Sequence, residues 1–170
     1  MTIFLDMDGV LADLFGHTSK IHDVETYQKI DKETYEKFYK DVDAEHLFSS
    51  LPAFDEANKI VEMIVKLFGE YNILSSPLNF DVAGSIKGKS LWLDQNISIP
   101  CQERVFEHRK FIYATTNNKP NILIDDYRPN IKSWNEAGGY GIKFQTDENS
   151  LEYLRESLLM AKSTLDTFFS

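Results

Sequence analysis

Four short polar segments hold the side chains best suited to chemistry. They are Asp-Met-Asp-Gly at 6–9, Ser-Ser-Pro at 75–77, the lysines Lys87 and Lys89, and Asp-Asp at 125–126. Two acidic pairs that meet at one place repel each other, so they need a bound cation, and carboxylate oxygens without His or Cys select Mg²⁺. A metal on carboxylates, with a lysine and a hydroxyl aimed at the same spot, suits a phosphoryl group undergoing in-line displacement. The set therefore predicts phosphoryl transfer.

The two aspartates of the first segment suit complementary roles in such a reaction. The Asp6 carboxylate can attack phosphorus and form an aspartyl-phosphate, which divides one difficult displacement into two easier ones. If neighbouring negative charge keeps Asp8 protonated, it can protonate the leaving alcohol and then draw a proton from the attacking water. We also expect the chain to leave strand geometry at Met7, helped by Gly9.

Short apolar runs predict the strands that carry these segments. The expected strands are 2–5, 71–74, 122–124 and 140–144, with a further strand or a hairpin within 104–114, and residues 117–120 are expected to form a loop. Helical patterns cover 51–68, 87–96, 129–137 and the chain from about residue 151. Strands that alternate with helices predict an α/β fold, with a doubly wound, Rossmann-like, three-layer core around a mostly parallel sheet. Ligands of such sheets lie beyond the carboxyl ends of the strands, which is where the polar segments fall.

The composition changes after the first segment, from an apolar run to polar residues mixed with aromatic ones. Apolar side chains recur there at three- and four-residue steps, as on short amphipathic helices: Tyr27, Ile30, Tyr35, Phe38 and Tyr39. We therefore expect a small helical cap at 14–50, inserted after the first strand, and a catalytic core made of 1–13 and 51–170.

Length, charge and cysteine content limit the classes of function. A chain of 170 residues with 42% hydrophobic residues suits one compact domain with a small insertion. Its net charge of -9 argues against a nucleic acid polymer as partner. Cys101 is the single cysteine, which fits a reducing compartment. Since neither a membrane span nor a signal pattern is found, we expect a soluble, cytoplasmic protein without a membrane partner. The oligomeric state stays open, with a homodimer as one option.

The polar segments also resemble those of a known superfamily. Asp6-Met7-Asp8-Gly9-Val10, following Ile3-Phe4-Leu5, is similar to the first motif of the haloacid dehalogenase (HAD) superfamily, and the order Asp-x-Asp, Ser, Lys, Asp-Asp is that superfamily's order. More narrowly, the chain resembles the 5'(3')-deoxyribonucleotidases through residues 6–13, Ser75-Ser76-Pro77, Lys89-x-x-Trp92 and Ile124-Asp125-Asp126. The resemblance spans most of the chain.

The resemblance implies a magnesium-dependent phosphomonoesterase that dephosphorylates nucleoside monophosphates, chiefly deoxyribonucleotides, through an aspartyl-phosphate. It implies Asp6 as nucleophile and metal ligand, and Asp8 as acid/base with its backbone carbonyl on Mg²⁺. Ser75 and Lys89 would bind the substrate phosphate. Asp126 would complete the metal site, with Asp125 beside it as a supporting acid or a second ligand.

The chain departs from the family's pattern at two places. The family's usual aromatic residue after Leu-Ala-Asp is replaced by Leu14, with Phe15 next, and Tyr127 intervenes between the Asp-Asp pair and Arg128-Pro129.

Several alternatives remain open from the sequence. Lys87 competes with Lys89 as the phosphate-binding lysine. The same core suits a sugar phosphate or another small organic phosphate, and a receiver domain that keeps its aspartyl-phosphate is the non-enzyme alternative. The aromatic residues of the cap either stack on a nucleobase or form the core of the cap itself: Phe15, Tyr27, Tyr35, Phe38, Tyr39 and Phe48.

Overall fold

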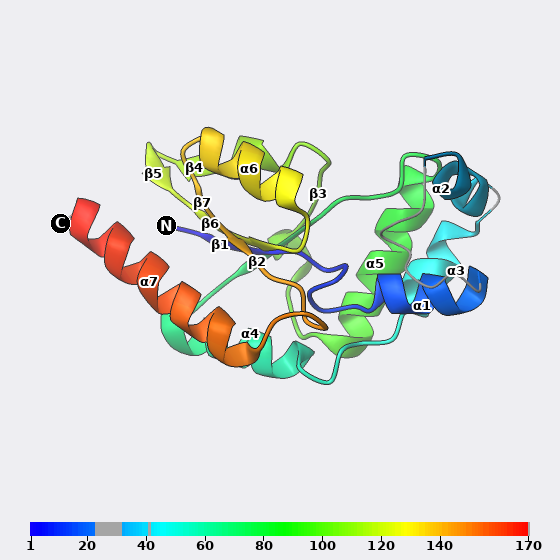
Figure 1. Cartoon of the computed structure of the whole chain (residues 1–170), viewed down its shortest axis with the longest axis horizontal. Helices are drawn as coiled ribbons and strands as arrows, with labels where there is room; N and C mark the ends of the chain where they lie inside the picture. The colour runs from blue at the N-terminus through cyan, green and yellow to red at the C-terminus, as the bar shows by residue number, and fades with distance from the viewer. Residues whose placement is uncertain (23–31, 41, 170) are drawn as a thin grey trace.

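A central parallel sheet organises the chain (Figure 1). The computed structural model describes residues 1–22, 32–40 and 42–169. Within them the main sheet has the strand order β3-β2-β1-β6-β7 and all of its neighbours are parallel. The strands are β1 (Ile3–Leu5), β2 (Asn72–Ser75), β3 (Arg104–Phe106), β6 (Ile122–Asp125) and β7 (Tyr140–Lys143). The expected strands are confirmed with shifts of one or two residues, and β1 lies in the middle.

Helices cover both faces of the sheet, because successive strand side chains point to opposite sides. On one face, Ile3 and Leu5 pack in the larger core cluster with buried residues of α4 (Ala57–Phe68) and α7 (Leu151–Phe169). On the other, Phe4 packs edge-on against Trp134 of α6 (Arg128–Glu136), with ring centroids 5.6 Å apart. Figure 1 shows α6 on one side of the sheet and α4 with α7 on the other. The predicted three-layer α/β core is confirmed.

Four further helices lie beside the carboxyl end of the sheet (Figure 1). They are α1 (Leu14–His22), α2 (Lys32–Tyr39), α3 (Ala44–Ser49) and, from later in the chain, α5 (Val82–Asn96). Helix α5 lies directly against α3, and the indole N–H of Trp92 donates to the Leu51 carbonyl at 2.8 Å. Tyr27 and Ile30, which contributed to the predicted helical pattern, lie outside the described residues.

Some boundaries and short elements differ from expectation. Helix α4 begins at Ala57 rather than near residue 51, and α5 begins five residues earlier than expected, where Asp81 accepts the Gly84 N–H at 2.8 Å as a helix cap. Within 104–114 only β3 is a strand, and it is followed by a 3-10 helix at Lys110–Tyr113. A short 3-10 turn at Cys101–Glu103 precedes β3.

The expected loop at 117–120 is instead part of a tight hairpin. Strands β4 (Thr115–Thr116) and β5 (Lys119–Pro120) pair antiparallel, with Thr116 opposite Lys119. The two residues between them, Asn117 and Asn118, have φ of 51° and 60°. Asparagine tolerates this left-handed region better than most residues, so an Asn-Asn pair can close a two-residue turn.

No helix in the described part of the chain combines the length and apolar character that a membrane span requires.

Candidate active site

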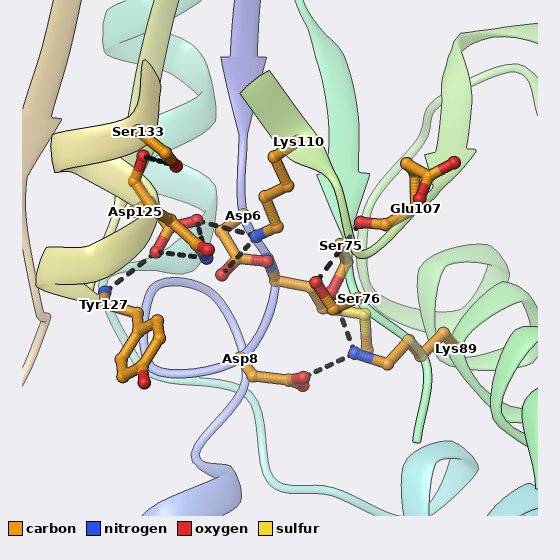
Figure 2. A network of polar contacts seen from close by, with 12 residues as sticks. Asp6, Asp8, Ser75, Ser76, Lys89, Glu107, Lys110, Asp125, Tyr127 and Ser133 are labelled. Atoms are coloured by element: carbon orange, nitrogen blue, oxygen red, sulfur yellow. Dashed lines mark hydrogen bonds and ion pairs between the residues drawn. The ribbon is translucent and has the colours of Figure 1, made fainter. Parts of the chain in front are cut away.

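The segment after β1 leaves strand geometry at once. The Asp6 N–H still donates to the Ile124 carbonyl at 2.9 Å, as a continuation of the sheet. The Met7 carbonyl then accepts the N–H groups of Leu11 and Ala12, at 2.8 and 2.9 Å, so the backbone curls into a compact turn. This turn presents Asp6 and Asp8 at the carboxyl edge of the sheet (Figure 2).

Gly9 is required at the centre of this turn. Its φ is 74°, and a Cβ atom there would lie 2.8 Å from the Phe15 ring and 2.9 Å from the Asp126 carboxyl carbon. Any other residue would therefore be strained and would push two neighbours away. The loop after β7 fixes the same turn, because Thr146 donates from its N–H to the Gly9 carbonyl (3.0 Å) and from its hydroxyl to the Val10 carbonyl (2.5 Å).

Lys89 links the first segment to the end of β2. Its ammonium donates to the Ser75 hydroxyl at 2.8 Å and forms an ion pair with the Asp8 carboxylate (Figure 2). Lys89 and Ser75 are both 0% exposed. Lys87, the competing lysine, is exposed and pairs with Glu45 at 2.9 Å. The structure thus brings Lys89, and not Lys87, to the expected site.

The two carboxylate oxygens of Asp8 have different surroundings. Its Oδ2 faces Lys89, whereas its Oδ1 is buried and has no hydrogen-bond partner among the described residues. Burial raises the pKa of the Asp8 carboxyl and the nearby Asp6 charge adds to this, although Lys89 opposes both. A carboxyl with a raised pKa and an unpartnered oxygen is suited to carry a proton to and from a ligand.

Asp6, Asp125 and Asp126 form an acidic cluster. Each offers one carboxylate oxygen, and these oxygens lie within 4.8 Å of one another. Burial and the neighbouring carboxylates raise the pKa of Asp126 to about 9. Because like charges this close resist ionisation together, a divalent cation would stabilise the cluster, and the oxygen-only donor set fits Mg²⁺.

The two acids of the pair have different surroundings. Asp125 is fully buried and accepts from the Lys110 ammonium at 2.6 Å, from the Tyr127 N–H at 2.8 Å and from the Asn130 side-chain amide at 3.0 and 3.2 Å. Both of its oxygens are therefore engaged by the protein. Asp126 is only partly buried, beside Gly9 and Asp6.

Lys110 is the site residue that the sequence analysis missed. It is 2% exposed, and its ammonium lies 2.9 Å from Asp6 and 2.6 Å from Asp125 (Figure 2). Burial alone would lower the pKa of Lys110, but the charges of Asp6 and Asp125 hold it above its usual range. The available signal was its place in a basic run, 108–110, which begins two residues after β3 ends at the same edge of the sheet.

The aromatic side chains of the inserted segment that the structure describes divide by their surroundings, whereas Tyr27 and the side chains of Tyr35 and Phe38 lie outside the described part. Tyr39 and Phe48 are buried in the large core cluster. Phe15 packs on Gly9, while Leu14, which replaces the aromatic residue usual in the family that the sequence resembles, is buried. Tyr127 is 58% exposed, and its backbone rather than its side chain contacts Asp125.

Comparison with known proteins relates most of the chain to one family. The model of one protein family, described as 5' nucleotidase, deoxy (pyrimidine), cytosolic type C protein, matches residues 1–156. No curated protein sequence matches the chain.

Solved structures with a similar fold are HAD-type and other hydrolases. One is a hydrolase from Pseudomonas syringae, with 14% identity, 99% of each chain covered and a TM-score of 0.51. Another is a HAD family enzyme from Bacteroides thetaiotaomicron, an aspartate-to-alanine mutant in complex with magnesium and inorganic phosphate, with 14% identity, 91% of this chain and 98% of that chain covered, and a TM-score of 0.53. A phosphonoacetaldehyde hydrolase-like protein from Oleispira antarctica has 11% identity and a TM-score of 0.52, over 99% of this chain and 85% of that chain.

Proposed function

Because the chain belongs to the family of cytosolic type C 5' nucleotidases, deoxy (pyrimidine), and is therefore a phosphoric monoester hydrolase, we propose that it dephosphorylates deoxyribonucleoside monophosphates with the help of Mg²⁺. The proposal rests chiefly on one observation. The Lys89 ammonium contacts both Asp8 and Ser75 at the carboxyl edge of the sheet, next to the acidic cluster that contains Asp6.

In the proposed reaction the Asp6 carboxylate attacks the phosphorus atom. The phosphate ester bond breaks, an aspartyl-phosphate forms on Asp6, and Asp8 gives its proton to the departing oxygen of the nucleoside. The Asp8 carboxylate then takes a proton from water, which attacks the same phosphorus. Inorganic phosphate leaves, and both carboxyl groups return to their starting states. The buried, unpartnered Oδ1 of Asp8 supports this role.

Ser75 and Lys89 are proposed to bind the phosphate. The hydroxyl and the ammonium lie 2.8 Å apart and are fixed by burial, so phosphate oxygens would meet donors that are already oriented. Lys110 is proposed to hold the Asp6 carboxylate in position, since its ammonium bridges Asp6 and Asp125.

For Mg²⁺ we propose the side chains of Asp6 and Asp126 and the backbone carbonyl of Asp8 as ligands. Asp125 then acts as the supporting acid, because both of its oxygens already accept hydrogen bonds from protein groups. When bound, the ion would neutralise charge on the phosphoryl group and on these carboxylates.

Residues 14–50 are proposed as a cap that limits the site to small molecules and excludes bulk water. A free nucleotide in the cytoplasm would be the substrate, in keeping with the cytosolic type of the matching family. Buried positions of Tyr39 and Phe48 support a structural rather than a base-stacking role for these two aromatic residues.

A substrate panel tests the proposal. Phosphate release from dUMP, dTMP, ribonucleotides and sugar phosphates is measured with Mg²⁺ and with EDTA. We expect the highest kcat/KM for deoxyribonucleotides and loss of turnover with EDTA. A preference for sugar phosphates would overturn the substrate assignment, and a single burst of phosphorylation without steady phosphate release would favour the receiver-like alternative.

The variant Asp6→Asn tests the nucleophile in the same assay. The amide cannot form the acyl-phosphate, so turnover should fall below about one per cent of wild type. Retention of more activity, in protein that binds inorganic phosphate normally, would contradict the mechanism.

A further inference from the structure

We propose that Phe48, on helix α3, positions the Lys89 ammonium for phosphate binding through the face of its aromatic ring. Phe48 touches neither substrate nor metal in this arrangement and acts only through Lys89. The inference rests on the proposed phosphate-binding role of Lys89 and adds a residue from the inserted segment to that site.

The contacts around Lys89 leave a specific place for the ring. An ammonium has three N–H groups, and among the described residues Asp8 and Ser75 are the hydrogen-bond acceptors of the Lys89 ammonium. The Phe48 ring centroid lies 4.4 Å from the Lys89 nitrogen, well inside the distance at which a ring face attracts a cation. Both side chains are buried, so water does not screen this attraction.

An aromatic ring holds a cation without competing for its hydrogen bonds. A carboxylate in the place of Phe48 would bind the ammonium strongly and would also repel an incoming phosphate. The ring instead offers only the negative face of its π system. Phosphate oxygens can therefore replace Asp8 as partners of Lys89 while the ring keeps the ammonium in place.

The backbone around Phe48 is fixed with little freedom. Asp43 accepts the His46 N–H at 3.0 Å at the start of α3. Gly88 of α5 lies so close to α3 that a Cβ atom there would be 2.5 Å from the Glu45 carbonyl oxygen. One residue further along α5 is Lys89 itself. The close helix contact thus places the ring and the ammonium together, and links the inserted segment to phosphate binding.

Fluorination of the Phe48 ring tests the proposal without changing its packing. Phe48 is replaced by phenylalanine with one, two and three ring fluorines, which progressively weaken the negative face at nearly constant size. Binding of inorganic phosphate is measured by titration calorimetry in the presence of Mg²⁺, and KM and kcat are measured with dTMP. We expect the Kd for phosphate and the KM to rise stepwise, by about three- to tenfold at three fluorines, with kcat changed less than about twofold.

The chain contains a matched control. The ring of Phe68 lies 5.4 Å from the ammonium of Lys162, on helices α4 and α7, in another part of the protein. The same fluorinated series at Phe68 should leave phosphate binding unchanged. Thermal unfolding of every variant should stay close to wild type, which separates positioning from stability.

The variant Phe48→Leu distinguishes the outcomes further. If Phe48 only fills space, Phe48→Leu lowers the melting temperature while the fluorinated series leaves the phosphate Kd unchanged, and the inference is overturned. A third outcome is that the wild type binds phosphate, fluorination at Phe48 weakens this binding, and the wild type releases no phosphate from nucleotides. The substrate proposal then fails and the role of Phe48 stands. Absence of phosphate binding by the wild type would overturn both.

Discussion

Lys110 places a positive charge of the protein itself next to the acidic cluster. It bridges the proposed nucleophile Asp6 and the buried Asp125, at 2.9 and 2.6 Å. Two carboxylates can therefore lie next to each other before any metal ion arrives. Buried charges of this kind depend on their partner, because loss of one leaves the other unpaired and desolvated.

The variant Lys110→Met tests this dependence. Methionine keeps much of the apolar stem but removes the ammonium, so Asp6 and Asp125 face each other without a cation. We expect the free energy of unfolding at pH 7 to fall by about 3 kcal/mol in urea titrations, and kcat to fall by at least about tenfold because Asp6 loses a fixed hydrogen-bond partner. The exposed Lys119, replaced in the same way, serves as control. If Lys110→Met were as stable as the wild type, the ion pairs of Lys110 with Asp6 and Asp125 would not stabilise the protein.

A second prediction at the residue scale concerns pH. Burial first, and then the charges of Asp6 and Asp125, raise the pKa of Asp126 from 3.8 to about 9. The pKa of Asp125 is also raised, to about 6. Between the ordinary and the raised values, the folded protein holds protons that the unfolded chain has released. Stability of the metal-free protein should therefore be greatest at low pH within this window, and should fall as pH rises toward about 9.

Urea titrations in EDTA from pH 5 to pH 9 measure this effect. Asp126→Asn removes the main titrating group, so its stability should fall less with pH than that of wild type, and Mg²⁺ should restore wild-type stability at high pH. If the free energy of unfolding changed with pH in the same way for wild type and Asp126→Asn, the acidic cluster would not control the pH dependence of stability.

Most candidate site residues could be predicted because their order along the chain carries information. Asp6, Asp8, Ser75 and Asp126 each follow an apolar run, and the carboxyl ends of parallel strands meet at one edge. Lys110 also lies at this edge, but it is four residues beyond the end of β3 at Phe106. The apolar residues after it suggested one strand or a hairpin within 104–114, whereas Phe111 and Ile112 are exposed in a 3-10 helix. Hydrophobic pattern alone could not separate these two possibilities.

At the scale of elements, the contact between α3 and α5 carries a specific prediction. An added methyl group at Gly88 would collide with backbone atoms of Ala44 and Glu45, so α3 would have to shift. We expect Gly88→Ala to lower the free energy of unfolding by about 1–3 kcal/mol, the usual cost of overpacking. It should also raise the KM for nucleotide, because α3 carries Phe48.

Lys87→Ala is a suitable control for Gly88→Ala. Lys87 is the preceding residue of the same helix, but it is exposed and pairs with Glu45 only at the surface. Its loss should change stability by less than about 1 kcal/mol and should leave KM unchanged. Equal effects of the two variants would contradict a close-packed contact at Gly88.

The elements differ in how far sequence could predict them. The strands that were found are short apolar runs bounded by polar residues, a pattern that burial in a parallel sheet imposes. The hairpin at 115–120 was missed because Thr115 and Thr116 are exposed and show no hydrophobic alternation. Its turn depends on the tolerance of Asn117 and Asn118 for positive φ, which composition does not reveal.

For the whole molecule, net charge and size should govern the choice of substrate. With a formal charge of -9, the protein repels a polyanion that must approach along an extended surface. We expect kcat/KM for a 5'-phosphorylated single-stranded decanucleotide to be at least about tenfold below that for the mononucleotide. This difference in kcat/KM should become smaller as the salt concentration increases, because salt screens the repulsion between protein and decanucleotide. Comparable rates for both at low salt would contradict this view.

The central place of β1 has a consequence for how the protein opens. Its neighbours on both sides are hydrogen-bonded strands, and the amide of Asp6 continues this ladder to Ile124 at 2.9 Å. In hydrogen–deuterium exchange, the amide hydrogens of such an inner strand exchange with solvent only when the sheet itself unfolds. The backbone that carries the proposed nucleophile should thus belong to the slowest-exchanging part of the chain, and it should stay in place while segments at the periphery open locally.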